Sequence, residues 1–304
     1  MKRKLYRFCF MLICILCLYG KTEAQAAEKK TANRSDGQIV GCQIRLPVAG
    51  KLYKSKKSKK KIAVIPRGTI LKVIKSGNHR FYVKYKKKKG WISEKHVFVN
   101  LVNYIPSIDY KLHLAKKKKL FNIKGKALRD INQNPFYTSK GVRQGKQCWL
   151  NYLAAKKLLK AQRVLRRDGY SIVLYDAYRP LSVSRKLYKA VSESSYVKEM
   201  GGAVGDYIAF RSAHNKGVAV DLTIKDIRTG KELAMPSQIM TLGVESSEQS
   251  WYYRFTKESR NARLLRRYMT QAGFLTLSTE WWHFQDGNHY QGTFCEEDYY
   301  NISQ

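Results

Sequence analysis

Two short segments far apart in the chain contain the residue types that bind zinc. The segment SAHNKGVAVDLTI contains His214 and Asp221, and the segment TEWWHF contains Glu280 and His283. Two imidazoles and one carboxylate make a three-ligand zinc site with one position left open. We therefore expect one Zn²⁺ per chain on His214, Asp221 and His283. Glu280 would be the proton carrier that hydrolysis at such a site needs.

The spacing of these residues makes demands on the backbone. Gly217 lies between His214 and Asp221 and permits a tight turn, so that a loop histidine and a strand aspartate can face one point. Asp221 lies inside an apolar strand pattern, where a carboxylate is costly unless it binds a metal or pairs with an interior arginine. Glu280 and His283 are three residues apart and would face opposite sides of a regular strand. We therefore expect an irregular or helical turn there.

The elements around these segments predict an α+β domain. Apolar residues recur at helical spacing from Leu150 to Asp168, with Gly169 as the end of the helix, and again over 258–272. The segments SIVLYDAYRP and VAVDLTI have the pattern of buried strands. Helices and strands mix without the regular alternation of a doubly wound fold, which favours α+β.

The N-terminus has the pattern of a secretory signal. Residues 1–26 combine a basic start, an apolar run of about a dozen residues and an A-x-A-like cleavage site. The alternative is an uncleaved anchor, although the run is shorter than the roughly 20 residues of a comfortable span. We expect cleavage, no stable membrane span afterwards, a polar linker over 27–40, and a secreted, cell-wall-associated protein.

The formal net charge is +37, and removal of the signal, with five Lys or Arg and one Glu, leaves +33. For an exported protein this charge indicates anionic cell-wall polymers as partners. Nucleic acid is disfavoured, because the protein is exported and contains no recognisable nucleic-acid module. The lysine runs at 56–61, 86–89 and 116–119 either form one anion-binding face or are solvated turns. Cys42, Cys148 and Cys295 are an odd number in the mature chain and predict buried or free thiols.

Closely spaced strand patterns with Gly and Asn turns predict a small all-β unit over 41–102. An early LY, the turn IPRGT, the strand FYVKY and the closing GWI resemble a bacterial SH3-type domain. Such a resemblance implies a barrel that targets the wall rather than one that performs chemistry. Residues 103–125 are interpreted as a polar passage, so the two units are expected to have separate cores.

The pattern S-x-H-x-x-G-x-A-x-D followed by E-W-W-H resembles the zinc D-alanyl-D-alanine dipeptidase family. YDAYRP at 175–180 and the upstream CWLNYLAAKKLLKAQ are similar to two further segments of that family, so the resemblance covers most of 126–304. It implies that His214, Asp221 and His283 ligate zinc. It also implies that Glu280 is the general base and then the general acid.

Two more roles follow from the same resemblance. Arg179 would stabilise the charge that develops on the scissile carbonyl, and Ser212 would help to hold the substrate. From the residues alone, Arg179 has the alternative of a salt bridge to Asp176.

One segment departs from the family. Strict dipeptidases carry an acid after the aspartate ligand that grips the free amine of the substrate, and in KELAMPSQIMTLGVESSEQS only Glu245 and Glu248 are candidates. We therefore expect hydrolysis of D-Ala-D-Ala, with removal of terminal D-Ala from peptidoglycan stem peptides as the alternative. A non-catalytic wall-binding protein is a further alternative, but the complete ligand set with its acid argues against it.

Overall fold

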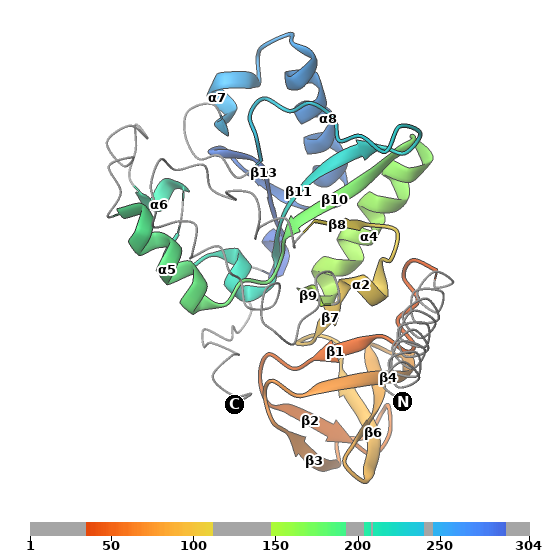
Figure 1. The fold of residues 1–304 in the computed structure, drawn as a ribbon. Coiled ribbons are helices and arrows are strands. Elements are labelled where there is room, and N and C mark those ends of the chain that lie inside the picture. Colours follow the sequence, from red (N-terminus) through yellow and green to blue (C-terminus); the bar gives the residue numbers. More distant parts are fainter. Residues whose placement is uncertain (1–34, 112–146, 193–203, 208, 240–245, 290–304) are drawn as a thin grey trace, which may run out of the picture.

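The computed structural model describes residues 35–111, 147–192, 204–207, 209–239 and 246–289. Two sheets lie one above the other in Figure 1, with the N-terminal sheet at the bottom. The signal at 1–26, most of the predicted linkers, the lysines at 116–119, Cys295 and Glu245 lie outside the described residues. No helix within the described ranges is long and apolar enough to cross a membrane.

The N-terminal sheet is entirely antiparallel and has the strand order β3-β2-β6-β5-β4-β1-β7-β9. Its strands are β1 (Gln43–Arg45), β2 (Gly50–Tyr53), β3 (Lys61–Ile65), β4 (Ile70–Gly77), β5 (Arg80–Tyr85), β6 (Lys88–Ser93), β7 (Phe98–Asn100) and β9 (Trp149–Asn151). The strand order is open, with β3 and β9 at its edges. The small all-β unit is thus present, whereas a closed barrel is not observed.

Alternation of side chains explains how this sheet forms. In β5, Phe81 and Val83 are buried on one face, whereas Arg80, Tyr82 and Lys84 alternate with them and point to the other face. One face of the unit therefore holds the core, and the opposite face is polar and aromatic.

The second sheet has the order β12-β13-β11-β10-β8, with only the β10–β8 pair parallel. It consists of β8 (Asp109–Tyr110), β10 (Tyr170–Asp176), β11 (Ala219–Asp226), β12 (Leu275–Leu277) and β13 (Glu280–Gln285). The long helices α4 (Tyr152–Arg167) and α8 (Lys257–Gln271) pack on each other, α4 against β10 and α8 against β12 and β13. The shorter helices are α2 (Leu101–Tyr104), α5 (Leu181–Ser192), α6 (Val204–Tyr207), α7 (Glu248–Trp251), η4 (Ala213–Lys216) and η6 (Gly287–His289). This mixture of helices with a mainly antiparallel sheet agrees with the expected α+β class.

The two long helices end at the glycines that the sequence indicates, and their starts lie within two residues of the predicted ones. The Asn151 side chain accepts a hydrogen bond from the Leu153 backbone N–H at 2.9 Å and caps the start of α4. Gly169 follows α4 with φ +85° and Gly273 follows α8 with φ +97°, the left-handed conformation that glycine adopts without strain. The helix predicted from Leu150 starts two residues later, because Leu150 belongs to β9 and pairs with Val99 of β7.

The two units share one hydrophobic core. Phe98 and Val99 of β7 belong to the same buried cluster as Trp149 and Leu150 of β9 and the interior of the second sheet. The start of the predicted polar passage is also part of this core, since Ile105 and Ile108 are buried and β8 pairs with β10. The expectation of separate cores is therefore wrong: apolar residues of the connection bind the units together. Cys42 and Cys148 are buried thiols, in line with the prediction, and neither forms a disulfide within the described residues.

Candidate metal centre and active site

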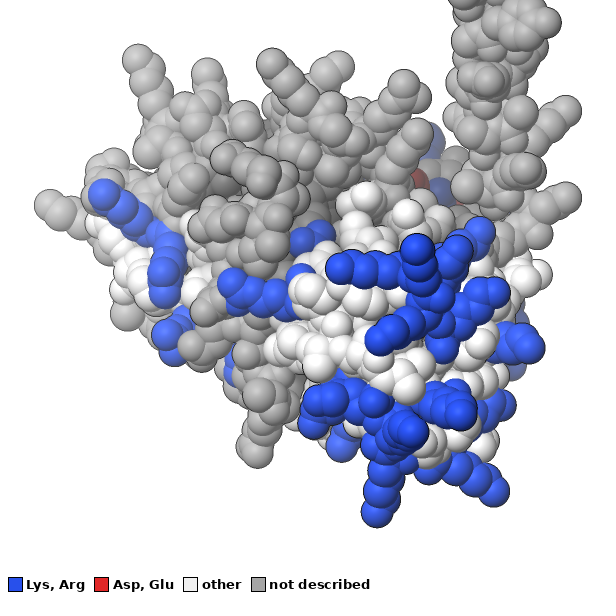
Figure 2. All heavy atoms as spheres, turned by 90° about the horizontal axis from the view of Figure 1, so that it is seen from below, with Lys and Arg blue, Asp and Glu red and all other residues white. Residues whose placement is uncertain are grey.

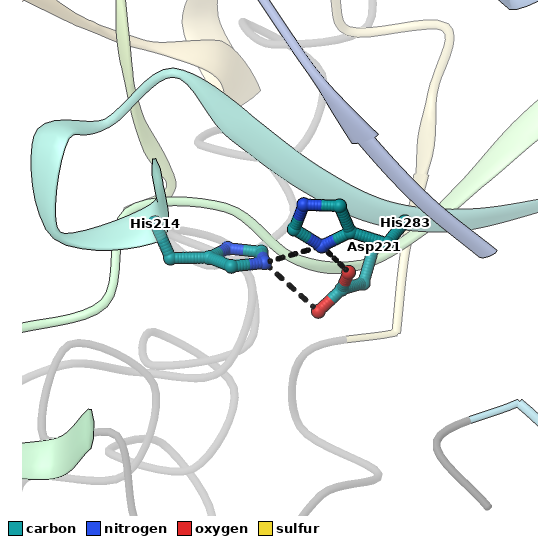
Figure 3. A group of neighbouring side chains, drawn as sticks. All are labelled: His214, Asp221 and His283. Carbon is teal, nitrogen blue, oxygen red and sulfur yellow. Dashed lines mark hydrogen bonds and ion pairs between the residues drawn. The ribbon is translucent and has the colours of Figure 1, made fainter. Parts of the chain in front are cut away.

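Three side chains from separate elements converge at one buried point. His214 comes from η4, Asp221 from β11 and His283 from β13, and Asp221 and His283 are direct partners across the β11–β13 pair. His214 Nε2 lies 3.2 Å from both His283 Nδ1 and Asp221 Oδ2, and His283 Nδ1 lies 3.1 Å from Asp221 Oδ1. Figure 3 shows the two rings and the carboxylate pointing toward one another. The sequence prediction that these three residues meet is thus matched by the fold.

This geometry fits a tetrahedral metal ion. Ligand atoms about 2.0–2.1 Å from a zinc ion lie about 3.3–3.4 Å apart in a tetrahedron. The two ring nitrogens are 3.2 Å apart, close to that value, and each faces a different oxygen of the Asp221 carboxylate. All three residues are buried, with 2–6% of their surface exposed. One ligand atom from each lies within 4.8 Å of the others, as a shared cation requires.

The tautomer of His214 supports the same conclusion. Its Nδ1 lies 2.7 Å from the Ala177 carbonyl oxygen, which can only accept, so Nδ1 carries the proton and donates it. In a neutral ring Nε2 then carries a lone pair and faces a carboxylate oxygen of Asp221 at 3.2 Å. This pair of atoms needs a positive charge between them: a metal ion in the loaded site, or a proton on Nε2 that is donated to Asp221 in the metal-free structure. A backbone carbonyl that orients a ligating imidazole in this way is the usual outer partner of a metal-binding histidine.

The turn that presents His214 depends on Gly217 and on the N-terminal sheet. Gly217 has φ +62°, and its backbone N–H donates to the His214 carbonyl at 3.0 Å. A Cβ atom at Gly217 would lie 2.6 Å from the Phe98 ring, which also packs on Tyr178 with ring centroids 5.1 Å apart. The Gly217 carbonyl accepts from the Asn151 N–H of β9 at 2.7 Å. Strands β7 and β9 therefore support the histidine turn directly.

Glu280 lies beside the three ligands. Its Oε2 is 3.8 Å from His283 Nδ1, and its side chain is buried. The register between β12 and β13 shifts between the pairs Thr276–Phe284 and Leu277–Glu280. The expected irregularity is therefore present as a break in the strand pairing. No helical turn is present here, because Glu280–Gln285 is strand throughout.

Burial raises the pKa of Glu280 to about 8, and the charge of Asp221 adds to this, while His283 and Arg179 oppose it. Burial also disfavours ionisation of Asp221, but the charge of His214 and the hydrogen bonds from His214 and His283 outweigh it, so the pKa of Asp221 lies well below its usual range. The two carboxyl groups thus differ as their expected roles require: Asp221 is a permanent anion, and Glu280 is able to take and release a proton near neutral pH.

Arg179 makes the salt bridge to Asp176 that its sequence context allowed, and it also reaches the candidate ligand Asp221. Its Nη2 lies 2.7 Å from Asp176 Oδ2 and 3.4 Å from Asp221 Oδ2, and its Nε donates to Asp176 Oδ2 at 2.8 Å. The salt bridge to Asp176 is therefore present, and it holds the guanidinium at the ligand cluster rather than away from it. Burial works against the charge of Arg179, but Asp176 and Asp221 together raise its pKa, so it stays a cation.

Asn215 organises the loop next to the ligands. Its Nδ2 donates to the Arg179 carbonyl at 2.9 Å and to Ser184 Oγ at 2.8 Å, and its Oδ1 accepts from the Ser212 N–H at 2.7 Å. Ser212 Oγ is buried and has no hydrogen-bond partner within the described parts of the chain. Its hydroxyl is therefore available to a substrate.

Three contributors were not assigned a role from the sequence: the Ala177 carbonyl, Asn215 and Phe98. Ala177 lies in YDAYRP and Asn215 in SAHNKG, so proximity to a motif was the available signal. Phe98 gave none, because it is far away in sequence. Trp281 and Trp282 are both buried, and Trp281 Nε1 donates to Ser237 Oγ at 3.0 Å. Both rings belong to the shared hydrophobic core.

No acid that could grip a substrate amine is placed free at the site by the described residues. Glu248 pairs with Arg266 at 2.5 Å. Glu232 accepts from the Tyr175 hydroxyl at 2.9 Å and pairs with Lys111. Glu245 lies outside the described residues.

Comparison with known proteins finds D-alanyl-D-alanine dipeptidases among the relatives of this chain. The chain is 32% identical over 154 residues to the D-alanyl-D-alanine dipeptidase of Escherichia coli, covering 49% of this chain and 72% of that protein. It is 32% identical over 143 residues to the enzyme of the same name from Enterococcus faecium, covering 44% and 70%. Among solved structures, VanYB in complex with D-alanine-D-alanine matches with a TM-score of 0.30 and 18% identity over 52% of this chain and 86% of that chain.

The model of the D-Ala-D-Ala dipeptidase family matches residues 127–302, which include every ligand and acid of the site. Together with the relatives above, this match shows that the chain belongs to the D-Ala-D-Ala dipeptidase family.

Proposed function

We propose that this protein is a zinc peptidase that hydrolyses D-Ala-D-Ala and related peptides of the bacterial cell wall. The observation that carries the proposal is the buried group His214, Asp221 and His283, whose possible ligand atoms lie within 4.8 Å of one another, with Glu280 beside it. One Zn²⁺ per chain would be held by these three residues and would polarise the scissile carbonyl and acidify a water molecule.

The chain's own residues then have separate tasks. The Glu280 carboxylate accepts the proton of the attacking water and delivers it to the leaving amine. Arg179, fixed by Asp176, places a guanidinium where negative charge develops on the carbonyl oxygen. Ser212 Oγ donates to or accepts from the bound peptide.

Removal of D-Ala from stem peptides is the second candidate. It is favoured by one observation: Glu232 and Glu248, which follow the aspartate ligand and belong to the described residues, are already engaged by other side chains. A buried acid dedicated to the substrate amine would reject an acylated substrate by leaving that acid unpaired. Without such an acid, longer peptides are not excluded.

The supporting roles proposed here are export through residues 1–26, a cell-wall location, and an SH3-type targeting unit over 41–102. Support for this unit comes from its short antiparallel strands and from the sequence resemblance. The predicted boundaries of the signal, the linkers and both domains remain part of this proposal.

The deciding experiment compares kcat/KM for D-Ala-D-Ala, N-acetyl-D-Ala-D-Ala and a stem pentapeptide, with and without added zinc. Zinc-dependent release of D-Ala from at least one of them is expected. A preference for the free dipeptide above about a thousandfold, roughly 4 kcal/mol, would reject the stem-peptide activity. No release from any of the three would reject the proposed function.

A further inference from the structure

The outer face of the N-terminal sheet carries a row of aromatic side chains in register across three neighbouring strands. Tyr82 of β5 pairs with Trp91 of β6, and Trp91 pairs in turn with Tyr53 of β2. The Tyr82 and Trp91 ring centroids lie 5.1 Å apart. The core side chains of these strands, such as Phe81 and Ile92, point to the opposite face. We call the row Tyr82, Trp91 and Tyr53 the aromatic row.

Each ring of the aromatic row carries a cation. Lys75 Nζ lies 6.0 Å from the centre of the Tyr82 ring, Lys56 Nζ 4.7 Å from Trp91, and Arg80 Cζ 4.5 Å from Tyr53. Arg80 Nη1 also donates to the Ser55 and Ser58 carbonyls at 3.4 Å each. The rings thereby hold three long side chains in place that would otherwise be free to move.

The strands that form the aromatic row carry so many positive charges that like charges repel one another across neighbouring strands. Lys84 of β5 and Lys89 of β6 are direct cross-strand partners, and like charges in that position destabilise a sheet. Residues 41–102 contain fifteen Lys and three Arg against a single acid, Glu94. Glu94 is buried and already engaged by His79 at 2.9 Å and by Lys156 at 3.5 Å.

The space-filling view from below shows the result. Lys and Arg side chains spread over this end of the molecule, and acidic side chains are nearly absent from the view (Figure 2). An uncompensated basic face of this kind attracts polyanions and binds them in a salt-dependent way. The facing pair Lys84 and Lys89 lowers the stability of the sheet, and binding of an anion is the simplest reason for the presence of this pair.

We propose that this basic face binds a phosphate-bearing polymer of the cell wall, such as poly(glycerol phosphate), and that Lys56, Lys75 and Arg80 on the aromatic row are its central contacts. At Trp91, the middle ring of the row, only 9% of the residue is exposed and Lys56 lies over the ring, so the cation rather than the ring meets the ligand there. Exposed cations suit a polymer of repeated phosphates that has no bases to stack on the rings. Single-stranded nucleic acid would need free ring faces for stacking. The choice of a wall polymer rests on the extracytoplasmic location in the proposed function.

The test uses the full chain and purified bacterial walls, either carrying poly(glycerol phosphate) or stripped of it by acid. The variant Lys56→Gln/Lys75→Gln/Arg80→Gln is compared with Lys231→Gln/Lys257→Gln/Arg228→Gln. The second triple removes the same number of Lys and Arg from exposed positions outside the N-terminal sheet. Binding is measured by co-sedimentation over a range of salt concentrations, with soluble poly(glycerol phosphate) and a single-stranded oligonucleotide as competitors. Hydrolysis of D-Ala-D-Ala is followed in the same preparations.

The first triple variant is expected to bind polymer-bearing walls at least tenfold more weakly than the control triple, with a shallower salt dependence and unchanged hydrolysis. Wild-type protein should lose most of its binding on stripped walls. Equal binding by the two triples, or equal binding to both kinds of wall, would overturn the proposal. Stronger competition by the oligonucleotide than by the polymer would assign the face to nucleic acid instead. Absence of hydrolysis alone would reject the peptidase function and leave the wall-binding result interpretable.

Discussion

The two sheets of this protein use charged residues in opposite ways. Around the second sheet, Asp176, Arg179 and Asp221 are buried and paired at distances from 2.7 to 3.4 Å. On the outer face of the N-terminal sheet, lysines are exposed and two of them, Lys84 and Lys89, face each other across neighbouring strands. A buried charge network fails when one member is removed, because its partner is left unpaired. An exposed basic face works through the sum of its charges, so no single lysine is essential.

The two sheets are nevertheless in direct contact and share one hydrophobic core. Phe98 on β7 packs against both Gly217 and Tyr178, which lie next to a metal ligand and to Arg179. The positions of His214 and Arg179 therefore depend on packing against the N-terminal sheet.

The largest loss should follow removal of a metal ligand. His283→Ala leaves two ligands of three, so bound zinc should fall from one to below about a tenth of an equivalent and D-Ala-D-Ala hydrolysis to background. Metal analysis and hydrolysis measure both effects. His79→Ala is the matched control, since that side chain is 90% exposed. Full zinc retention after the combined replacement of His214, Asp221 and His283 by Ala would contradict the assigned centre.

Glu280→Gln should keep the zinc and lower kcat by about 10²–10⁴-fold, because the amide is nearly isosteric but cannot accept the proton of the water. Glu258→Gln, in the first turn of α8, is the control and should not change activity. If the Glu280→Gln variant retained activity within about tenfold of wild type, another group would be the base.

Arg179→Lys should reduce kcat by about 10²–10³-fold, in line with the loss of one oriented donor to a developing oxyanion. The ammonium group cannot reproduce the planar contacts that Asp176 makes with Nε and Nη2. Steady-state kinetics with D-Ala-D-Ala are the measurement. Arg266→Lys tests the same exchange at the Glu248 pair and should be silent. A change confined to KM would assign Arg179 to ground-state binding instead.

Phe98→Ala tests the joint between the regions. Both this variant and Phe81→Ala remove a buried ring from the N-terminal sheet and should lower stability by about 3–5 kcal/mol. Only Phe98→Ala loosens the turn that presents His214, so it alone should also lower kcat, by about tenfold, through a small misplacement of the ligand. Thermal unfolding and kinetics below the transition separate the two effects. Equal kcat values for the two variants would show that the contact of Phe98 with the Gly217 turn affects only the stability of the protein. A chain starting at residue 103 could then be active.

The smallest effect is expected for Lys84→Gln. Removing one of two facing lysines should raise stability by about 0.2–1 kcal/mol. It should weaken wall binding by less than about twofold, because the remaining charges still sum to a strong field. Denaturant unfolding and co-sedimentation measure the two opposite changes. A loss of binding as large as that of the triple variant would mean a single specific contact rather than a distributed face.

Sequence alone predicted the three candidate ligands, the acid beside them and most of the elements that carry them. His214, Asp221 and His283 were recognisable because metal chemistry restricts residue types, and Asp221 was conspicuous as a charge inside an apolar strand. The ends of α4 and α8 followed from glycines whose positive φ angles are local properties of the chain.

Only the tertiary structure decided how these parts are held together. The pairing of β7 with β9, the contact of Phe98 with Gly217 and the shared core join residues 50 to more than 100 positions apart. Local periodicity indicates which face of an element is apolar, but it does not identify the partner of that face. Arg179 illustrates the same point, since its pairing with Asp176 and its place at the active site appeared as alternatives in the sequence. In the fold both are true, because the loop after β10 brings the pair to the buried carboxylate of Asp221.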